Sequence, residues 1–315
     1  MEPKAQIVVF KGIEGWCDRL QVLAHCIQYC LSTQATLCVD WSDHVWRGSE
    51  NFDFYDCFSL EGVKTMTKDE LCLYVDEERE VPLTITPDVW TLDTLLDTPI
   101  EMLHNQDIGG PLMKPREHND ACEIIKEDII VTNGTGWRVF YPGFITEHIR
   151  VTPKLRHAII PILKDFNPNL LTVHLRGTDR PDTQGTFDQV IEGLKKSPQY
   201  GNAKAVINVV TDTKELWKRF KAEFPGAKLV NPNTHLLRLP SSKHGIHQFE
   251  DALIDGLGIT KWDMLVDLMA DWYALCYAKL AIGRTESTFF AMARRMHEMG
   301  PENVSKMLGW KPFYC

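Results

Sequence analysis

The chain has 315 residues, of which 44% are hydrophobic and 24% charged, so disorder and collagen-like repeats are excluded. This length is about twice that of a typical domain, which predicts two domains. The formal net charge of −9 argues against a general nucleic-acid binder. The charge is unevenly spread, since residues 1–150 carry a net charge of −14 and residues 151–315 one of +5.

Short apolar runs that are rich in β-branched residues alternate with helical patterns along the whole chain. These runs predict strands at 7–10, 36–40, 129–132, 170–175, 205–211, 228–230 and 279–283. Apolar residues spaced by three and four predict helices at 19–31 and 263–278, and we expect further helices at 154–166, 214–224 and 288–299. Strands that alternate with helices indicate parallel sheets and therefore an α/β protein.

Two stretches depart from this alternation. Residues 43–119 are acidic and aromatic, and we expect them to form insertions and helices over one face, with most of their aromatic side chains in the core rather than stacked on a ligand. Residues 137–153 contain Pro142, Gly143 and Pro153 and are the predicted linker. The prediction is therefore two domains, at 1–150 and 151–315, that face each other across a cleft, a common place for ligands.

The cysteines and the N-terminus indicate the compartment. No signal peptide precedes the first apolar run, and no segment reaches about 18 uninterrupted apolar residues, so we expect no membrane span and a cytoplasmic location. The nine cysteines are odd in number and include no Cys-x-x-Cys pair, which favours free thiols over disulfides.

The first candidate motif is a glycine-containing loop between the strand at 7–10 and the helix after it. Gly12 and Gly15 allow a close backbone approach to a ligand, and the following helix, with Asp18 and Arg19 in its first turn, could hold an anion at its N-terminus. An ordinary strand-to-helix turn explains the same glycines equally well.

The second motif is the sequence His-Leu-Arg-Gly-Thr-Asp, at the carboxyl end of the strand at 170–175. Open α/β sheets bind ligands at this edge. Strand alternation puts His174 and Arg176 on one face, where an arginine can form paired hydrogen bonds to phosphate oxygens. His174 is either a site residue or a core histidine that orients Arg176.

Two further strand ends carry polar residues. Asp212 follows the strand at 205–211 and is either a helix N-cap or an acceptor for a base or ribose. Arg284, Glu286, Ser287 and Thr288 follow the strand at 279–283, where hydroxyls, a cation and a helix N-terminus predict a phosphate site. The pair His244 and His247 lacks further metal ligands, so no metal site is predicted.

The order of these motifs resembles the fucosyltransferase superfamily, which includes the α-1,6-fucosyltransferases, the rhizobial nodulation fucosyltransferase and the protein O-fucosyltransferases. The resemblance covers most of the chain at the level of motifs. It implies a GT-B-like fold with two Rossmann-type domains. It also implies an inverting, metal-independent glycosyltransferase that moves fucose from GDP-fucose to a glycan hydroxyl, with no nucleic-acid partner.

The same resemblance implies roles for particular residues. Arg176 would hold the β-phosphate, Asp212 would address the nucleoside, and the first-domain loop would face donor and acceptor. Further residues would shape the donor pocket, namely His174, Thr178, Asp179, Ser287 and Thr288. The candidates for the base on the acceptor side are Glu14, Asp18, Asp40 and His44.

Three departures from the family pattern bear on the donor. Gly177 stands where the α-1,6 enzymes have a second arginine, and Thr213 stands where they have a second aspartate. Arg180 stands where some members have a lysine. Another donor, such as UDP-xylose or GDP-rhamnose, is therefore an alternative. A non-catalytic protein that binds a nucleotide sugar or a glycan is another.

Overall fold

The computed structural model describes residues 6–12, 15–41, 53–78, 82–98, 124–133, 142–177, 183–201, 205–240, 249 and 251–312. Contacts divide the chain into two compact units, of which the first comprises Met1–Arg47 and Asn51–Thr152 and the second comprises Gly48–Glu50 and Pro153–Cys315. Within the described residues, no helix combines the length and the apolar character that crossing a bilayer requires.

The first unit is built on a parallel sheet of five strands, in the order β4-β2-β1-β6-β5. The two central strands are buried along their whole length, as expected of a sheet that is covered on both faces. The strands are β1 (Ile7–Lys11), β2 (Thr36–Asp40), β4 (Thr65–Met66), β5 (Ile85–Thr86) and β6 (Ile129–Thr132).

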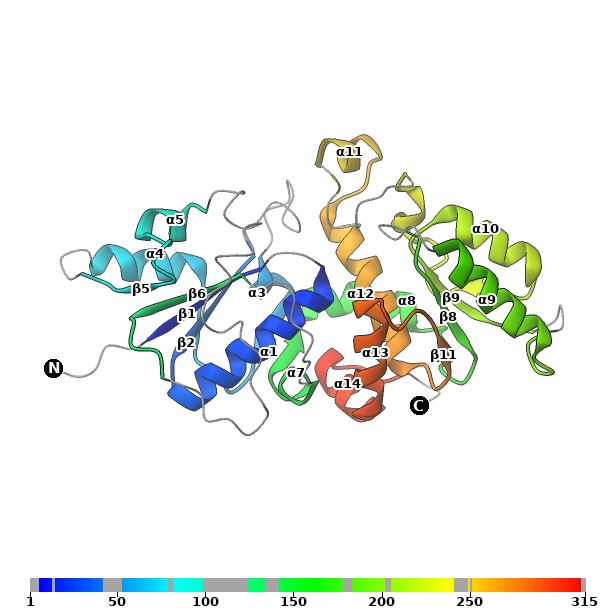
Figure 1. The fold of residues 1–315 in the computed structure, drawn as a ribbon, viewed down its shortest axis with the longest axis horizontal. Helices are drawn as coiled ribbons and strands as arrows, with labels where there is room; N and C mark the ends of the chain where they lie inside the picture. The colour runs from blue at the N-terminus through cyan, green and yellow to red at the C-terminus, as the bar shows by residue number, and fades with distance from the viewer. Residues whose placement is uncertain are drawn as a thin grey trace. The chain divides into compact units, whose positions relative to one another are not determined.

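Helices pack on the two faces of this sheet (Figure 1). The helix α1 (Trp16–Thr33) contacts β1 and β2. On the opposite face, Ile7 and Val9 form a core with Leu71 and Leu95, which come from α4 (Lys68–Glu77) and α5 (Leu92–Leu96). The short helix α3 (Phe54–Cys57) also belongs to this unit.

The aromatic residues of the acidic stretch are buried or half-buried where the structure describes them. Phe54 and Trp90 are 0% and 3% exposed, and Tyr55 is half-buried. Phe54 packs edge-on against Trp41, with ring centroids 5.2 Å apart. The predicted core role is therefore confirmed for these aromatic residues, and Trp46 and Phe52 lie outside the described residues.

The predicted linker was only partly right. Residues 142–151 form the helix α7 (Pro142–His148) and the strand β7 (Ile149–Val151). The strand β7 pairs in antiparallel register with β3 (Phe58–Leu60), about 90 residues earlier in the chain. A strand that pairs with so distant a segment has no signal in its own sequence. The local residues Pro142 and Gly143 therefore indicated a loop.

The second unit contains a parallel sheet of four strands, in the order β10-β9-β8-β11. All four coincide with predicted strands, with shorter ends. The strands are β8 (Thr172–Leu175), β9 (Asn208–Thr211), β10 (Lys228–Leu229) and β11 (Ala281–Ile282).

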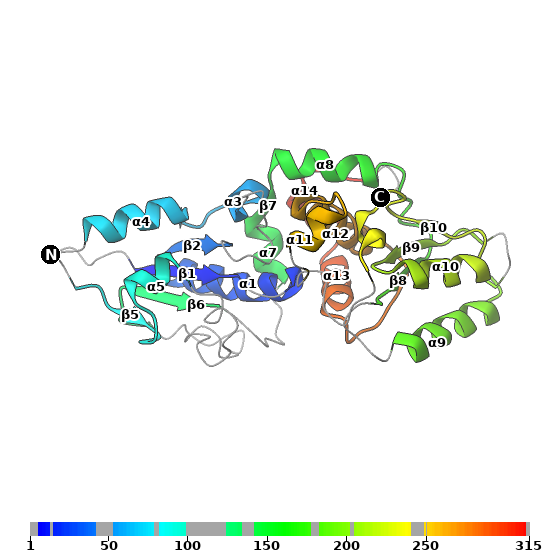
Figure 2. The ribbon, with the colours of Figure 1, turned by 90° about the horizontal axis from the view of Figure 1, so that it is seen from above.

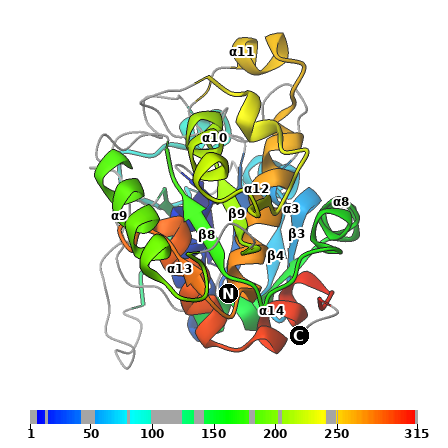
Figure 3. The same ribbon diagram turned by 90° about the vertical axis from the view of Figure 1, so that its right-hand side faces the viewer.

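The faces of this second sheet are covered by two pairs of helices (Figures 2 and 3). Val173 and Leu175 point into a core made with α9 (Thr183–Lys196) and α10 (Lys214–Glu223). On the other face, His174 contacts aromatic rings of α13 (Thr288–Glu298), which packs against α12 (Lys261–Tyr277). The unit also contains α8 (Pro153–Leu163), α11 (Asp251–Gly256), α14 (Pro301–Leu308) and the 3₁₀ helix η4 (His235–Arg238).

The helix α12 is the central helix of the second unit and is buried on nearly all sides. The capping box of Thr260 and Asp263 closes its N-terminus. At its C-terminus, Arg294 of α13 donates hydrogen bonds to the carbonyls of Leu275 and Ala278, at 3.2 and 2.6 Å. These bonds satisfy carbonyls that have no partner inside the helix, and they fix α13 to α12.

The predicted fold class is confirmed: the chain is an α/β protein with two separate parallel sheets. The thiol prediction is confirmed for the seven cysteines in the described part of the chain, which are all free. They are Cys17, Cys26, Cys30, Cys38, Cys57, Cys72 and Cys276.

Candidate functional site

The candidate donor site lies where the strand order of the second sheet reverses. From β8 the chain proceeds outward through β9 and β10, and it then returns to add β11 on the other side of β8. Open α/β sheets bind ligands outside the carboxyl ends of the strands at such a reversal. Arg176 follows β8 there, and Arg284 follows β11.

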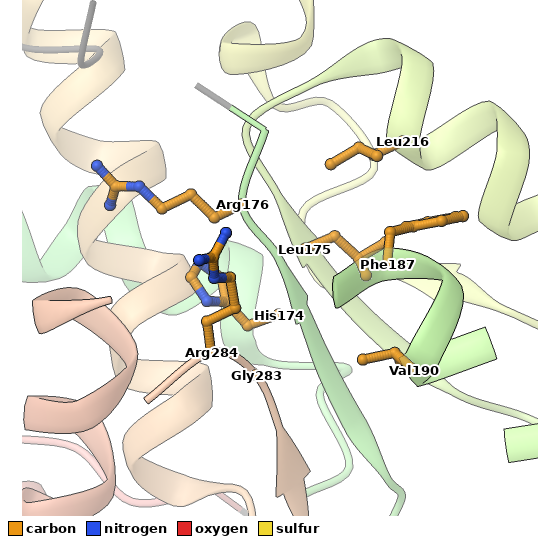
Figure 4. A pocket seen from close by; sticks show the side chains of 8 residues that line it. All are labelled: His174, Leu175, Arg176, Phe187, Val190, Leu216, Gly283 and Arg284. Carbon is orange, nitrogen blue, oxygen red and sulfur yellow. The ribbon is translucent and has the colours of Figure 1, made fainter. Parts of the chain in front are cut away.

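A pocket occupies this position (Figure 4). The side chains of Arg176, His174 and Arg284 lie on one side of the β8 end, and the apolar side chains of α9 and α10 lie on the other. The complete lining consists of His174, Leu175, Arg176, Phe187, Val190, Leu216, Gly283 and Arg284. The predicted residues Arg176, His174 and Arg284 are thus brought together around one pocket.

His174 is held in place by two phenylalanine rings. Its ring stacks on Phe290 at 5.9 Å and lies 5.6 Å from Phe289. Burial, assisted by the charge of Arg176, lowers the pKa of His174 to about 3, so the imidazole is neutral near pH 7. Its Nδ1 atom is buried and has no hydrogen-bond partner among the described residues, although buried polar atoms are normally paired.

Asp212 joins the ends of β8 and β9. Its Oδ1 accepts a hydrogen bond from the Gly177 backbone N–H at 2.7 Å. The N-cap of α10 is Thr213, so the N-cap interpretation of Asp212 was wrong. A Cβ atom at Gly177 would lie 2.6 Å from Cγ2 of Thr213 and 2.9 Å from Cδ1 of Leu216. A side chain at position 177 would therefore have to displace Thr213 or Leu216.

The segment that begins α13 carries two more unpaired polar atoms. Ser287 is the N-cap residue, yet its side chain makes no capping hydrogen bond, and its buried Oγ has no partner in the described part of the chain. The buried Nη1 of Arg284 likewise has none. The Arg284 Nε atom lies 3.8 Å from Oε2 of Glu286, whose side chain is 69% exposed. Thr288, the first residue of α13, is half-buried.

Two buried carboxyl groups of α12 were missed at the sequence level. Asp271 and Asp267 are 4% and 2% exposed. Burial, the nearby Asp267 and then Asp212 raise the pKa of Asp271 well above its usual value. Asp267 accepts hydrogen bonds from Asn231 and from the His235 backbone, each at 2.6 Å. Aspartates four residues apart on an otherwise apolar helix were the available signal.

In the first unit, Gly12 follows β1 and lies against two large side chains. A Cβ atom at Gly12 would lie 2.7 Å from Cδ1 of Trp41 and would also overlap the Arg19 guanidinium. Arg19 is 1% exposed, and its guanidinium lies 5.1 Å from the centre of the Trp41 ring. This close approach requires glycine at position 12. Gly15 is the N-cap of α1, without a side-chain hydrogen bond, and Asp18 lies in the first turn.

Asp40 is engaged in a buried ion pair. Its Oδ2 lies 2.5 Å from the Lys11 Nζ and 3.7 Å from the Lys68 Nζ. Lys11 also donates a 2.5 Å hydrogen bond to the carbonyl of Leu95. Burial lowers the pKa of Lys11, and the Asp40 carboxylate offsets part of this effect. Because Lys11 engages its carboxylate, we exclude Asp40 from the candidate bases.

Several predicted residues lie outside the described residues, so their placement is not tested. They are Glu14, His44, Thr178, Asp179 and the histidines 244 and 247. Within the described ranges, no three His, Cys, Asp or Glu side chains gather in a way that could hold a metal ion.

The comparisons with known proteins concern the fold. No family model matches the sequence, and no curated protein matches it. The structure of NodZ α-1,6-fucosyltransferase soaked with GDP-fucose matches with a TM-score of 0.60 and 17% identity, over 93% of this chain and 92% of that one. Fucosyltransferase NodZ from Bradyrhizobium matches with a TM-score of 0.60 and 19% identity, over 93% of both chains. The chain therefore has a fucosyltransferase-like fold, with two Rossmann-like units.

Proposed function

We propose that the protein is a glycosyltransferase that takes a sugar from a nucleoside diphosphate donor. The observation that carries this proposal is the set of buried, unpaired atoms at the strand-order reversal, namely Nδ1 of His174, Nη1 of Arg284 and Oγ of Ser287. Leaving such atoms unpaired costs about 1–3 kcal/mol each, which is tolerated where a ligand completes the bonds. Two arginines at the same place favour an anionic ligand.

The donor that we propose is GDP-fucose. The fold is that of NodZ, whose structure was soaked with GDP-fucose, and the motif residues resemble those of the same superfamily. The second unit, with its net charge of +5 over residues 151–315, is the proposed donor domain, and the first unit is the proposed acceptor side.

The proposed reaction is a single displacement with inversion at the anomeric carbon. The acceptor hydroxyl oxygen forms a bond to that carbon while the bond to the β-phosphate oxygen breaks, and the electron pair of that bond leaves with the diphosphate. Arg176, Arg284 and the α13 N-terminus would stabilise the growing negative charge without rearranging. Fixed cations in these positions make the proposed reaction independent of a divalent metal.

The acceptor proton has to be taken up by a base or by water. With Asp40 engaged by Lys11, the remaining candidates are Asp18 in the first turn of α1, together with Glu14 and His44. Proton transfer to such a group contributes about 10²–10⁴-fold to the rate of many enzymes.

The Arg176→Ala variant tests this function. Transfer to a glycan acceptor is measured with GDP-fucose, GDP-rhamnose and UDP-xylose as donors, in buffer that contains EDTA. We expect transfer from GDP-fucose by the wild type, and a loss of about 10²–10³-fold in kcat/KM for the variant. Arg295→Ala is the matched control, because Arg295 lies exposed on α13.

The alternatives give different results. A folded Arg176→Ala protein with full activity would refute the assignment of the site. Nucleotide binding without turnover of any donor would support the non-catalytic alternative. If EDTA abolished the activity and Mn²⁺ restored it, the proposal that the protein stabilises the leaving diphosphate without a metal would be wrong.

A further inference from the structure

Arg284 and Glu286 form an incomplete ion pair at the candidate diphosphate site. The distance of 3.8 Å between Nε and Oε2 exceeds that of a hydrogen bond. The Arg284 side chain is 17% exposed, whereas that of Glu286 is 69% exposed. The carboxylate thus offsets the charge of Arg284 from the solvent side.

This pairing leaves the buried part of the guanidinium unsatisfied. Glu286 faces Nε, while the buried Nη1 has no partner among the residues described. Ser287, the next residue, is 4% exposed and has an unpaired Oγ. A ligand oxygen at this place could satisfy Nη1 and Oγ, which Glu286 does not.

The position of Glu286 also sets it against an anionic ligand. It immediately precedes the N-cap of α13, an 11-residue helix whose positive N-terminal end attracts negative charge. A carboxylate and a phosphate group would therefore compete for the same cation and the same helix end. In a site built only for affinity, this position would be neutral, because like charges repel.

We propose that Glu286 offsets the charge of Arg284 in the free protein and thereby weakens the binding of the donor diphosphate at this site. This inference rests on the proposed function, since it concerns the same site. Because the Glu286 carboxylate faces the same guanidinium, it opposes any anion that binds Arg284. Glu286 thus lowers the affinity of the site for the donor and for its nucleoside diphosphate product.

The test is the affinity of the 315-residue chain for GDP and for UDP, measured by calorimetry, in the wild type and in Glu286→Gln. Exposed ion pairs are weak, so we expect binding of the preferred nucleotide to tighten about two- to fivefold in the variant. The gain should shrink at high salt, which screens exposed charges. Glu298→Gln is the matched control, because Glu298 lies exposed at the other end of α13, and it should leave the affinity unchanged.

A double-mutant cycle with Arg284→Gln separates the mechanism from general repulsion. If Glu286 acts by offsetting the charge of Arg284, its removal does not tighten nucleotide binding in the Arg284→Gln background. An equal gain in both backgrounds, or no gain in the wild-type background, overturns the role of Glu286 and leaves the proposed function intact. If the wild type binds neither nucleotide, the proposed function fails and the role of Glu286 fails with it.

Discussion

Gly177 fits its place in the structure because it has no side chain. A Cβ atom there would meet Thr213 and Leu216, and the Gly177 N–H is held by Asp212. Gly177→Ala must therefore displace the Thr213 and Leu216 side chains or shift the loop after β8. Overpacking of this kind costs about 1–3 kcal/mol, so we expect a lower free energy of unfolding in urea and weaker nucleotide binding.

Gly193→Ala is the matched control for this substitution. Gly193 lies within α9, and a Cβ atom there would meet nothing within 4 Å. Alanine is a better helix former than glycine by about 1 kcal/mol, so this variant should be as stable as the wild type or more so. If Gly177→Ala behaved like Gly193→Ala, the close packing between Gly177 and Thr213 would be unimportant.

The sequence predicted the positions of these residues better than their contacts. Arg176 and Arg284 were placed correctly at strand ends, because apolar runs mark where buried strands stop. The partner of Asp212 was not predictable, since Gly177 is 35 residues earlier in the chain and only the pairing of β8 with β9 brings the two together. The missing hydrogen bond of Ser287 also depends on the folded geometry of α13.

At the scale of elements, Lys11 links three parts of the first unit. Its Nζ lies at the end of β1 and contacts Asp40 at the end of β2 and the Leu95 carbonyl of α5. Lys11→Met would leave the Asp40 carboxylate buried without its 2.5 Å partner, while the Lys68 Nζ stays 3.7 Å away. Breaking a buried pair in this way costs about 3–5 kcal/mol, so we expect a clear fall in the urea midpoint of the first unit.

The double variant Lys11→Met with Asp40→Leu shows whether charge is the cause. Replacing both partners by apolar groups removes the unpaired carboxylate, and such replacements are often neutral or stabilising. We therefore expect the double variant to recover most of the stability that Lys11→Met loses. A double variant less stable than the single one would show that the pair matters for shape rather than charge.

The sequence predicted central elements better than peripheral ones. The strands β2 and β6 have the predicted bounds, because their apolar runs are sharply delimited. The helix α9 was missed although Phe187, Ile191 and Leu194 follow a helical period, because its two glycines, Gly185 and Gly193, disfavour a helix. The strand β7 has three residues and depends on pairing with β3, so its own sequence could not reveal it.

At the scale of the whole molecule, the polar groups that suit a diphosphate all belong to the second unit. His174, Arg176, Arg284 and Ser287 lie between residues 153 and 315, where the net charge is positive, whereas residues 1–150 carry a net charge of −14. A donor with two or more negative charges therefore meets an attractive field in one unit and a repulsive one in the other. This distribution of charge and polar groups predicts that a nucleotide binds to the second unit.

Hydrogen–deuterium exchange of the full chain, with and without saturating GDP, shows which segments the nucleotide protects. We expect slower exchange in peptides that span the ends of β8, β9 and β11 and the start of α13, because a ligand that binds the native state suppresses local opening around its site. Arg176→Ala should abolish most of this protection, since it removes a cation from the same pocket. Protection centred instead on the ends of β1 and β2 would place the donor in the first unit, and the assignment of donor and acceptor domains would then have to be exchanged.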